Sequence, residues 1–503
     1  MRDFGAVGDG VAVDTGAVNR AIMMASDSGG GVVWLPAGTY LCYSIRLRSR
    51  VSLQLSPGAT ILGAGVAVGA GPERRYDEAE HNPWDAYQDY GHSHWHNSLM
   101  WGEDLHDISI AGSGLIWGRG LSRGASEQPL AEALGMGNKA LALKNCRNIL
   151  LRDFSILEGG HFAVLATGVD NLTIDNLLID TNRDGIDVDC CRNVRISNCS
   201  VNSPWDDAIC PKSSYALGAP RITENLTITQ CYVTGAYQMG TMLDGTWKRW
   251  PADKSALPDV KPYFPDEFNG SIKLGTESNG GFRNVVVANC VFDGCKGLAL
   301  ESSDGAQVED IVVSGITLRD CTNAPLFFRL GGRMRGPEGA AVGTMRGIVI
   351  SDVVSHNSVS RLGGGGIFSG IPGHDIEDVK VHNVYLEHRG GGTAQQAALD
   401  PPEGAEDNPY PDPDQFGDIP ACGFYVRHVK NIEFSNVEIA FRDPDLRPAV
   451  RMEHVEEADF FRFKTPRGRS GSVFLLRDVK DFRVASSRGV DDTHLESAME
   501  KKL

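Results

Sequence analysis

Five aspartates lie close together in the segment TNRDGIDVDCCRNVRISNCSVNSPWDDAICPKSS, residues 181–214: Asp184, Asp187, Asp189, Asp206 and Asp207. Carboxylates this dense repel one another, so the fold must give them a use. Three uses compete: a solvated acidic face, a calcium site, and the paired carboxylates of glycoside hydrolysis. In the last, one carboxyl stays protonated to donate to the leaving oxygen and another stays ionised to activate water. The choice depends on where the fold places them.

A short β phrase recurs along the chain and predicts the elements that carry these residues. It reads NILLRDFSIL from Asn148, NLTIDNLLID from Asn171 and NVRISNCSVN from Asn193, a spacing of 22 or 23 residues. Alternating β-formers are typical of strands, and a fixed repeat of about 20–50 residues indicates a solenoid. We therefore predict an all-β parallel β-helix, with asparagines and cysteines stacked about 4.8 Å apart in internal ladders. A β-propeller fits less well, because its blades span about 40–50 residues.

The two ends differ from the repeat, and we predict one domain over residues 1–503. Residues 1–60 form an N-terminal cap and first coil, with a capping helix that begins at Asp14 or Thr15 and ends before the glycines 29–31. Its apolar face comprises Ala17, Val18, Ile22 and Met23. This helix would cover the open strand edge of the first coil. In the tail, 484–503, Thr493 and Glu496 have capping-box spacing, which predicts a C-terminal helix.

The coil period also predicts which aspartates meet. Asp184 and Asp206 are 22 residues apart, so we expect them to stack on one wall, with Asp207 beside Asp206. Three carboxylates would then face one groove across two adjacent coils. Asp187 and Asp189 alternate with apolar residues and are expected to be bystanders or subsite residues.

Composition limits the partners. A net charge of −17 argues against nucleic acid or an anionic membrane, although a local basic pocket could still bind an acidic polysaccharide. The eleven cysteines form no C-x-x-C pair, and they are expected to be small buried hydrophobes. We expect no metal and no cofactor. No apolar signal segment opens the chain, so it is cytoplasmic as written, and periplasmic or secreted if sequence is missing upstream.

The aspartate motifs resemble those of glycoside hydrolase family 28, the polygalacturonase group of the pectin-lyase-like superfamily. NRDGID (182–187) and DDAICPKSS (206–214) are similar to the family's N-T-D-G-x-D and D-D-x-I-x-x-K-S. DFGAVGDGVAVDTGAVNRAI (3–22) and GGVVWLPAGTY (30–40) resemble its N-terminal cap and first coil. The resemblance implies a right-handed β-helix and an inverting hydrolase of an oligo- or polysaccharide. It also implies Asp206 as general acid, Asp184 and Asp207 as the water-activating pair, and Lys212 as the lysine of the second motif.

The chain departs from the family downstream of these motifs. Tyr237 and Gln238 stand near the place of the family's G-H-G histidine. The family's R-I-K motif falls opposite GLALESS, where Ala299 and Glu301 replace the two cations. Lys273, in SIKL, looks like part of that motif but precedes its expected coil, so it is either a substitute or a coincidence.

These departures leave the substrate open between two classes. The substrate is a pectic or related uronate-containing glycan if Arg183, Lys212 or Lys273 restores the lost positive charge. A neutral-sugar glycoside, such as a rhamnoside, is equally compatible. A polysaccharide lyase and an inactive carbohydrate-binding β-helix are the alternatives from other functional classes.

Several aromatic or basic segments outside the repeat could line the groove. His92, His94 and His96 are spaced for a zinc site on a strand, but the aromatic residues around them favour a loop over the sugar groove. His161 lies 23 residues before Asp184 and could face the same groove. Arg329 and Arg427 belong to later segments of this kind. Long insertions on one side would close the groove into a pocket, which favours an exo-acting enzyme.

Overall fold

The computed structural model describes residues 1–65, 71–89, 91–123, 134–181, 183–249, 268–358, 365–403, 410–466 and 471–503. These residues form two compact units, Met1–Gly270 and Ser271–Leu503. The single domain over 1–503 stays a prediction, and each unit is described by itself. No helix among the described residues is long and apolar enough to cross a membrane.

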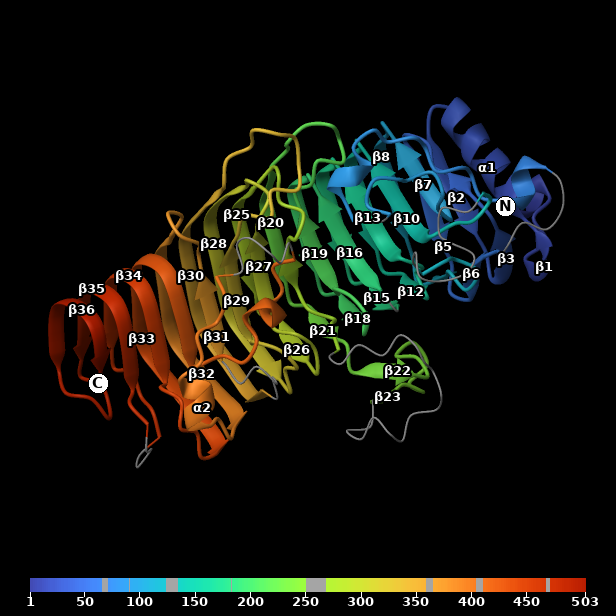
Figure 1. Cartoon of the computed structure of the whole chain (residues 1–503). Helices are drawn as coiled ribbons and strands as arrows, with labels where there is room; N and C mark the ends of the chain where they lie inside the picture. Colours follow the sequence, from blue (N-terminus) through green and yellow to red (C-terminus); the bar gives the residue numbers. More distant parts are fainter. Residues whose placement is uncertain are drawn as a thin grey trace. The chain divides into compact units, whose positions relative to one another are not determined.

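In Met1–Gly270 each complete coil contributes one strand to each of three parallel lines, as a β-helix requires (Figure 1). The first line is β4 (Ile45–Arg46), β7 (Met100–Glu103), β10 (Lys139–Lys144), β13 (Phe162–Thr167), β16 (Asp184–Asp189) and β19 (Ile209–Lys212). The second is β2 (Gly31–Leu35), β5 (Val51–Leu55), β8 (His106–Ala111), β11 (Arg147–Arg152), β14 (Asp170–Asp175), β17 (Arg192–Ser197) and β20 (Thr223–Thr229). The third is β1 (Asp9–Val13), β3 (Gly38–Cys42), β6 (Ala59–Gly63), β9 (Leu115–Trp117), β12 (Ser155–Leu157), β15 (Leu178–Asp180), β18 (Ser200–Asn202) and β21 (Tyr232–Thr234). The predicted right-handed parallel β-helix is confirmed.

The coils are held in register by side chains that repeat at one position. Inside, one position of the second strand line carries a buried stack of apolar residues that are paired strand to strand: Ile149, Leu172, Val194 and Leu226. The predicted asparagine ladder runs over the same coils, but its side chains are exposed at the corners and not internal as predicted. Asn171 donates to Asn148 (2.9 Å), Asn193 to Asn171 (3.1 Å) and Asn225 to Asn193 (3.0 Å). Each of these asparagines has a φ of 56–58°, a left-handed conformation that asparagine tolerates better than most residues.

The cysteines behave as predicted. All eleven are buried free thiols. The repeated ones donate to a carbonyl two residues earlier, as Cys199 does to Ser197 (3.2 Å) and Cys231 to Thr229 (3.3 Å). They fill the bend between two strands of a coil and satisfy a backbone acceptor there.

The N-terminal helix is α1, Thr15–Asp27, which buries Ala17, Val18 and Ile22 as predicted. Met23, expected on the apolar face, is instead 49% exposed. Asp14 is the N-cap residue, but its carboxylate accepts from the backbone of Val7 and Gly8 and not from the helix. A short hairpin, β22 (Tyr237–Met239) with β23 (Lys248–Arg249), projects from the coils (Figure 1).

In Ser271–Leu503 the same architecture uses longer strands that bend at the corners. The first line is β24 (Lys273–Leu274), β27 (Leu298–Ser302), β29 (Leu326–Leu330), β31 (Gly366–Ser369), β33 (Phe424–Asp443), β34 (Val450–Phe461) and β35 (Phe474–Ala485). The second and third lines are formed by β25 (Phe282–Ala288), β26 (Val291–Asp293), β28 (Gln307–Arg319), β30 (Thr344–Ser358), β32 (Ile376–Gly390) and the later parts of β33 to β35. A short helix, α2 (Ala394–Ala397), lies between β32 and β33.

The predicted C-terminal helix is wrong. Residues Thr493–Lys502 form β36, which pairs antiparallel with β35 from Val484↔Thr493 to Leu475↔Lys502. The last coil would otherwise present an unpaired strand edge, and hydrogen bonds to that edge outweigh a local capping signal.

Candidate active site

Asp184, Asp206 and Asp207 come together in Met1–Gly270 and form the candidate site. One carboxylate oxygen from each lies within 4.8 Å of the other two. Asp184 begins β16, and the other two lie in the turn that leads to β19. Three like charges this close cannot all stay ionised without a strong opposing charge, so the arrangement favours a shared proton.

The stacking that brings them together differs by one residue from the prediction. Asp187 pairs with Cys210, a spacing of 23, and the Gly185 N–H donates to the Asp207 carbonyl at 2.9 Å. Asp184 is therefore level with Asp207, not with Asp206. Gly185 permits this approach, because a Cβ there would collide with the Ala208 carbonyl oxygen. The extra residue lies in the turn before β19.

Arg183 and Asp206 form the accessible part of the site. The Arg183 Nη2 donates to Asp206 Oδ2 at 2.6 Å, and the two side chains are 31% and 22% exposed. The Asp207 N–H donates to the other Asp206 oxygen at 3.1 Å. Asp184 and Asp207 are buried. A sugar that enters the site would therefore meet the Arg183–Asp206 pair first.

The protonation of Asp184 follows from its surroundings. Burial raises the pKa of Asp184 well above its ordinary value, and the negative charges of Asp206 and Asp187 raise it further. Lys212 and Arg183 oppose this shift without cancelling it. Burial therefore favours the protonated form of Asp184, whereas the ion pair with Arg183 favours the ionised form of Asp206.

Asp187 and Asp189 have different surroundings, although both are buried. Asp187 lies between His92 Nε2 (3.5 Å) and Lys212 Nζ (3.9 Å). Asp189 accepts hydrogen bonds from Ser214 N (2.7 Å) and Ser214 Oγ (2.5 Å). Asp189 thus anchors the chain after β19, as expected of a bystander, whereas Asp187 contacts a lysine and a histidine beside the site.

His161 lies in the same neighbourhood, as expected from its spacing. The strand register sets its neighbour Phe162 opposite Asp184, and the His161 ring stacks on Phe162 with centroids 4.3 Å apart. Burial lowers the pKa of His161 well below its ordinary value, and Arg183, His92, Lys139 and Lys212 lower it further. His161 is therefore a neutral imidazole among cations.

Sequence reasoning missed Lys139 and the part played by His92. Lys139 is fully buried, donates to Asn138 Oδ1 at 2.6 Å and lies 5.8 Å from the Phe162 ring centroid. His92 reaches Asp187 from the segment before β7. Both come from parts of the chain without the aspartate motif, so no local spacing marks them.

The three histidines of the H-x-H-x-H motif do not converge. His92 faces Asp187 (3.5 Å), His94 faces Asp85 (3.4 Å) and His96 faces Glu103 (2.8 Å). This segment covers the first strand line, where Trp95 is buried and donates to Thr167 Oγ1 at 3.0 Å. The geometry agrees with the covering loop and not with a zinc site.

Tyr237 lies in the β22–β23 hairpin, where its ring stacks on Trp247 with centroids 3.9 Å apart. Gln238 belongs to the same strand, but its side chain lies outside the described residues, as do residues 250–267. Their substrate-binding roles stay predictions.

Lys273 and Glu301 belong to Ser271–Leu503. Lys273 pairs with Ala299 of the following coil, so it precedes the coil of Ala299 and Glu301, as predicted. Its Nζ donates to the Tyr410 hydroxyl at 3.1 Å. Glu301 is buried and accepts from Thr276 Oγ1 at 3.1 Å. Their roles at a substrate stay predictions.

Arg329 and Arg427, expected to line a groove, are buried instead beneath a covering segment. Arg329 donates to the Glu403 carbonyl (2.8 Å) and Arg427 to the Pro401 carbonyl (2.9 Å). The sequence did not indicate that the region before β33 folds back over the strands.

Comparison with known proteins gives this geometry a context. Residues 85–239 match the model of glycosyl hydrolases family 28, and residues 1–70 match that of rhamnogalacturonase A/epimerase, pectate lyase-like. A protein named "Probable polygalacturonase" from Vitis vinifera is 24% identical over 413 residues, which are 76% of this chain and 73% of that protein. Plasmin and fibronectin-binding protein A of Streptococcus pneumoniae is 30% identical over 308 residues, 58% of this chain but only 39% of that protein.

Among solved structures, the family 28 exopolygalacturonase of Yersinia enterocolitica superposes with a TM-score of 0.64 at 17% identity. That match covers 91% of this chain and 77% of the other. At this identity the similarity establishes the fold. The family match adds the chemistry, because residues 85–239 contain all three clustered aspartates. That region is of the glycosyl hydrolases family 28 type, and the chain is a polygalacturonase-like O-glycosyl hydrolase.

Proposed function

We propose that the chain is an inverting, exo-acting hydrolase that removes terminal uronate residues from a pectic or related glycan. The observation that carries the proposal is the Arg183–Asp206 ion pair at the accessible side of the three-aspartate cluster. A uronate carries a carboxylate on each sugar, and a guanidinium binds carboxylates with directed, charge-assisted hydrogen bonds.

The substrate carboxylate would bind Arg183 and replace Asp206 as its ion-pair partner. Asp206 would then lose the positive charge that stabilises its ionised form, and the proton stored on Asp184 would move to it. Asp206 would donate this proton to the leaving glycosidic oxygen as general acid. Asp184, now ionised, would position and activate water together with Asp207.

The surrounding cations support an acidic substrate. Lys212 and Arg183 place positive charge beside the cluster, although the chain as a whole carries −17. Such a local basic site can attract an anionic sugar to an acidic protein.

Exo action is supported by the segment that carries His92 and Trp95. It packs on the first strand line, where Trp95 joins Phe162 and Leu165 in one buried cluster. A groove covered in this way accepts a chain end more readily than the middle of a polymer.

Inversion rests on the family match alone. The usual separation of the two carboxyl groups in inverting glycosidases is about 6.5–9.5 Å. The aspartate oxygens lie closer than this, within 4.8 Å. The anomer of the first sugar released distinguishes inversion from retention.

A neutral-sugar glycosidase is the second candidate, because Glu301 is buried where the family has a cation. A panel of oligogalacturonides and rhamnose-terminated oligosaccharides, separated by anion-exchange chromatography, distinguishes the two. We expect wild type to shorten only oligogalacturonides, one residue at a time, and Asp206→Asn to be inactive. Asp107→Asn, which changes an exposed aspartate at a coil corner, is the matched control and should retain activity. Release of rhamnose alone would favour the second candidate.

A further inference from the structure

The corner that follows the first strand line in Ser271–Leu503 carries two histidines and an aspartate in consecutive coils. The strand register pairs Arg427 with Glu453 and Glu453 with Arg477, so His428, His454 and Asp478 occupy equivalent positions. All three have left-handed backbone, with φ of 50°, 53° and 50°. The two imidazole rings stack with centroids 4.9 Å apart and an interplanar angle of 8°.

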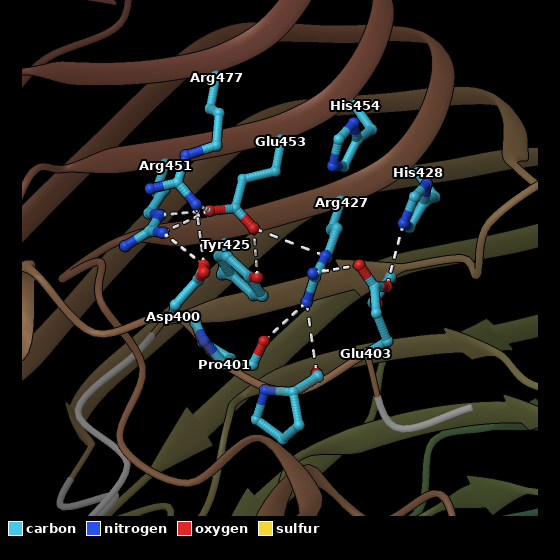
Figure 2. A network of polar contacts seen from close by, with 12 residues as sticks. Asp400, Pro401, Glu403, Tyr425, Arg427, His428, Arg451, Glu453, His454 and Arg477 are labelled. Atoms are coloured by element: carbon cyan, nitrogen blue, oxygen red, sulfur yellow. Dashed lines mark hydrogen bonds and ion pairs between the residues drawn. The ribbon is translucent and has the colours of Figure 1, made fainter. Parts of the chain in front are cut away.

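Glu403 reaches this corner from the covering segment 397–403 (Figure 2). Arginines from three coils hold that segment by its carbonyl oxygens: Arg329 at Glu403 (2.8 Å), Arg427 at Pro401 (2.9 Å) and Arg451 at Leu399 (2.5 Å). The buried Glu453 holds Arg451 and Arg427 in place, with N–O separations of 2.5 Å and 3.5 Å. Glu403 is therefore positioned by a rigid support.

We propose that Glu403, His428 and His454 form a binding site for a divalent transition-metal ion of the Zn²⁺ type. One potential ligand atom from each residue lies within 4.8 Å of the other two. Two imidazole nitrogens and one carboxylate oxygen are a common three-ligand set for Zn²⁺, with water in the fourth position.

Two of the three ligands, Glu403 and His454, have a second polar contact that orients them. Glu403 Oε1 accepts from Arg427, which leaves Oε2 for the ion. Oε2 lies 3.0 Å from His428 Nε2, close to the separation of about 3.3 Å expected for two ligands of one tetrahedral Zn²⁺. His454 Nδ1 lies 2.9 Å from Asp478 Oδ2. A carboxylate that accepts from one ring nitrogen directs the lone pair of the other nitrogen towards a metal.

The bound ion would join the covering segment to the corners of β33 and β34. It would therefore stabilise the attachment of that segment as well as the fold.

The test is a calorimetric titration of the metal-free full-length chain with Zn²⁺ alone, with Co²⁺ absorption as a check on nitrogen ligation. We expect one equivalent to bind to wild type. His454→Ala and Glu403→Gln should each weaken the affinity about tenfold or more. His494→Ala is the matched control, because that exposed histidine also lies near a carboxylate, Asp481 at 3.1 Å, and should change nothing.

His454 is 42% exposed, so its replacement should not prevent folding. A rise in melting temperature with Zn²⁺ should occur in wild type and be lost in both ligand variants. Failure of wild type to bind one equivalent would overturn the proposal. The proposal would also be overturned if both His454→Ala and Glu403→Gln bound Zn²⁺ with the affinity of wild type.

Discussion

The guanidinium of Arg183 donates to the Asp206 carboxylate at 2.6 Å, beside a buried Asp184 whose pKa is raised by burial and by neighbouring charges. The cluster therefore separates its acids by environment. Arg183 stabilises the ionised form of the accessible carboxylate, and burial favours the protonated form of the inaccessible one. Under the proposed mechanism, substrate binding at Arg183 would reverse this distribution and so link recognition of a carboxylate to formation of the catalytic acid.

Replacing Arg183 with Gln should weaken uronate binding. The loss of a hydrogen bond between charged groups costs about 1.5–3 kcal/mol, so KM for an oligogalacturonide should rise about tenfold or more. Arg221→Gln breaks another 2.6 Å ion pair, with Asp170, and should leave KM unchanged. An unchanged KM in Arg183→Gln would show that Arg183 does not bind the substrate carboxylate.

The same variant should shift the pH profile. Arg183 is among the charges that lower the pKa of Asp184, so its removal lets a carboxyl in the cluster keep its proton to higher pH. The basic limb of kcat/KM, where the acid loses its proton, should move upward. A downward shift would contradict the stored-proton arrangement.

Asp184→Asn should abolish activity and yet stabilise the fold at neutral pH. Folding raises the pKa of this carboxyl, so its protonated form adds to the free energy of unfolding. That contribution is complete below the unfolded pKa of about 3.9 and is lost as pH rises through the folded pKa. Wild type should therefore melt progressively below Asp184→Asn as pH rises from about 4 to about 7. A folded pKa that lies one pH unit above the unfolded pKa corresponds to about 1.4 kcal/mol.

The control for this effect is Asp189→Asn. Burial raises the pKa of Asp189 as well, but two hydrogen bonds from Ser214 oppose that shift. Asp189→Asn weakens those hydrogen bonds, so it should gain less melting temperature at pH 7 than Asp184→Asn does. A melting temperature of Asp184→Asn below that of wild type at pH 7 would mean that the charge of Asp184 does not destabilise the fold.

The asparagine ladder predicts a separable effect on stability. Asn171→Ala loses the hydrogen bonds to Asn148 and from Asn193 and must also adopt a φ of 56°. Asn171→Gly loses the hydrogen bonds but tolerates that φ. We expect alanine to lower the unfolding free energy by about 1–2 kcal/mol and glycine by less. Urea unfolding of both variants measures the difference, and equal losses would show that the backbone conformation adds no cost.

The cysteines should be unreactive in the native protein. Burial raises the pKa of Cys146 to about 11 and that of Cys191 to about 12, so few thiolates form at pH 8. A thiol-reactive chromophore should label fewer than one cysteine per native chain and eleven after denaturation. Rapid labelling of several native thiols would contradict the buried ladders.

The repeat made most of the fold predictable, because a phrase such as NLTIDNLLID marks the strand, the corner asparagine and the buried face together. The clustering of Asp184, Asp206 and Asp207 followed from the same period. The exact register did not, because one extra residue in the turn before β19 sets Asp184 opposite Asp207. A turn can absorb a residue without any change in the strand pattern.

The residues that sequence reasoning missed depend on long-range packing. His92 reaches Asp187 from a segment several coils earlier, and Lys139 comes from another coil. The capping-box spacing at Thr493 indicated a helix, but the open edge of β35 recruits the segment as a strand. Local signals fail where an unsatisfied edge or a covering loop decides the structure.

The most direct test of the account is proton NMR of the first sugar released from an α-linked oligogalacturonide, recorded before the anomers equilibrate. We predict that wild type releases monomeric β-galacturonate first, by inversion, and that Asp206→Asn releases none. First release of the α-anomer, a 4,5-unsaturated product that absorbs in the near ultraviolet, or equal activity of wild type and Asp206→Asn would contradict inverting hydrolysis by these aspartates.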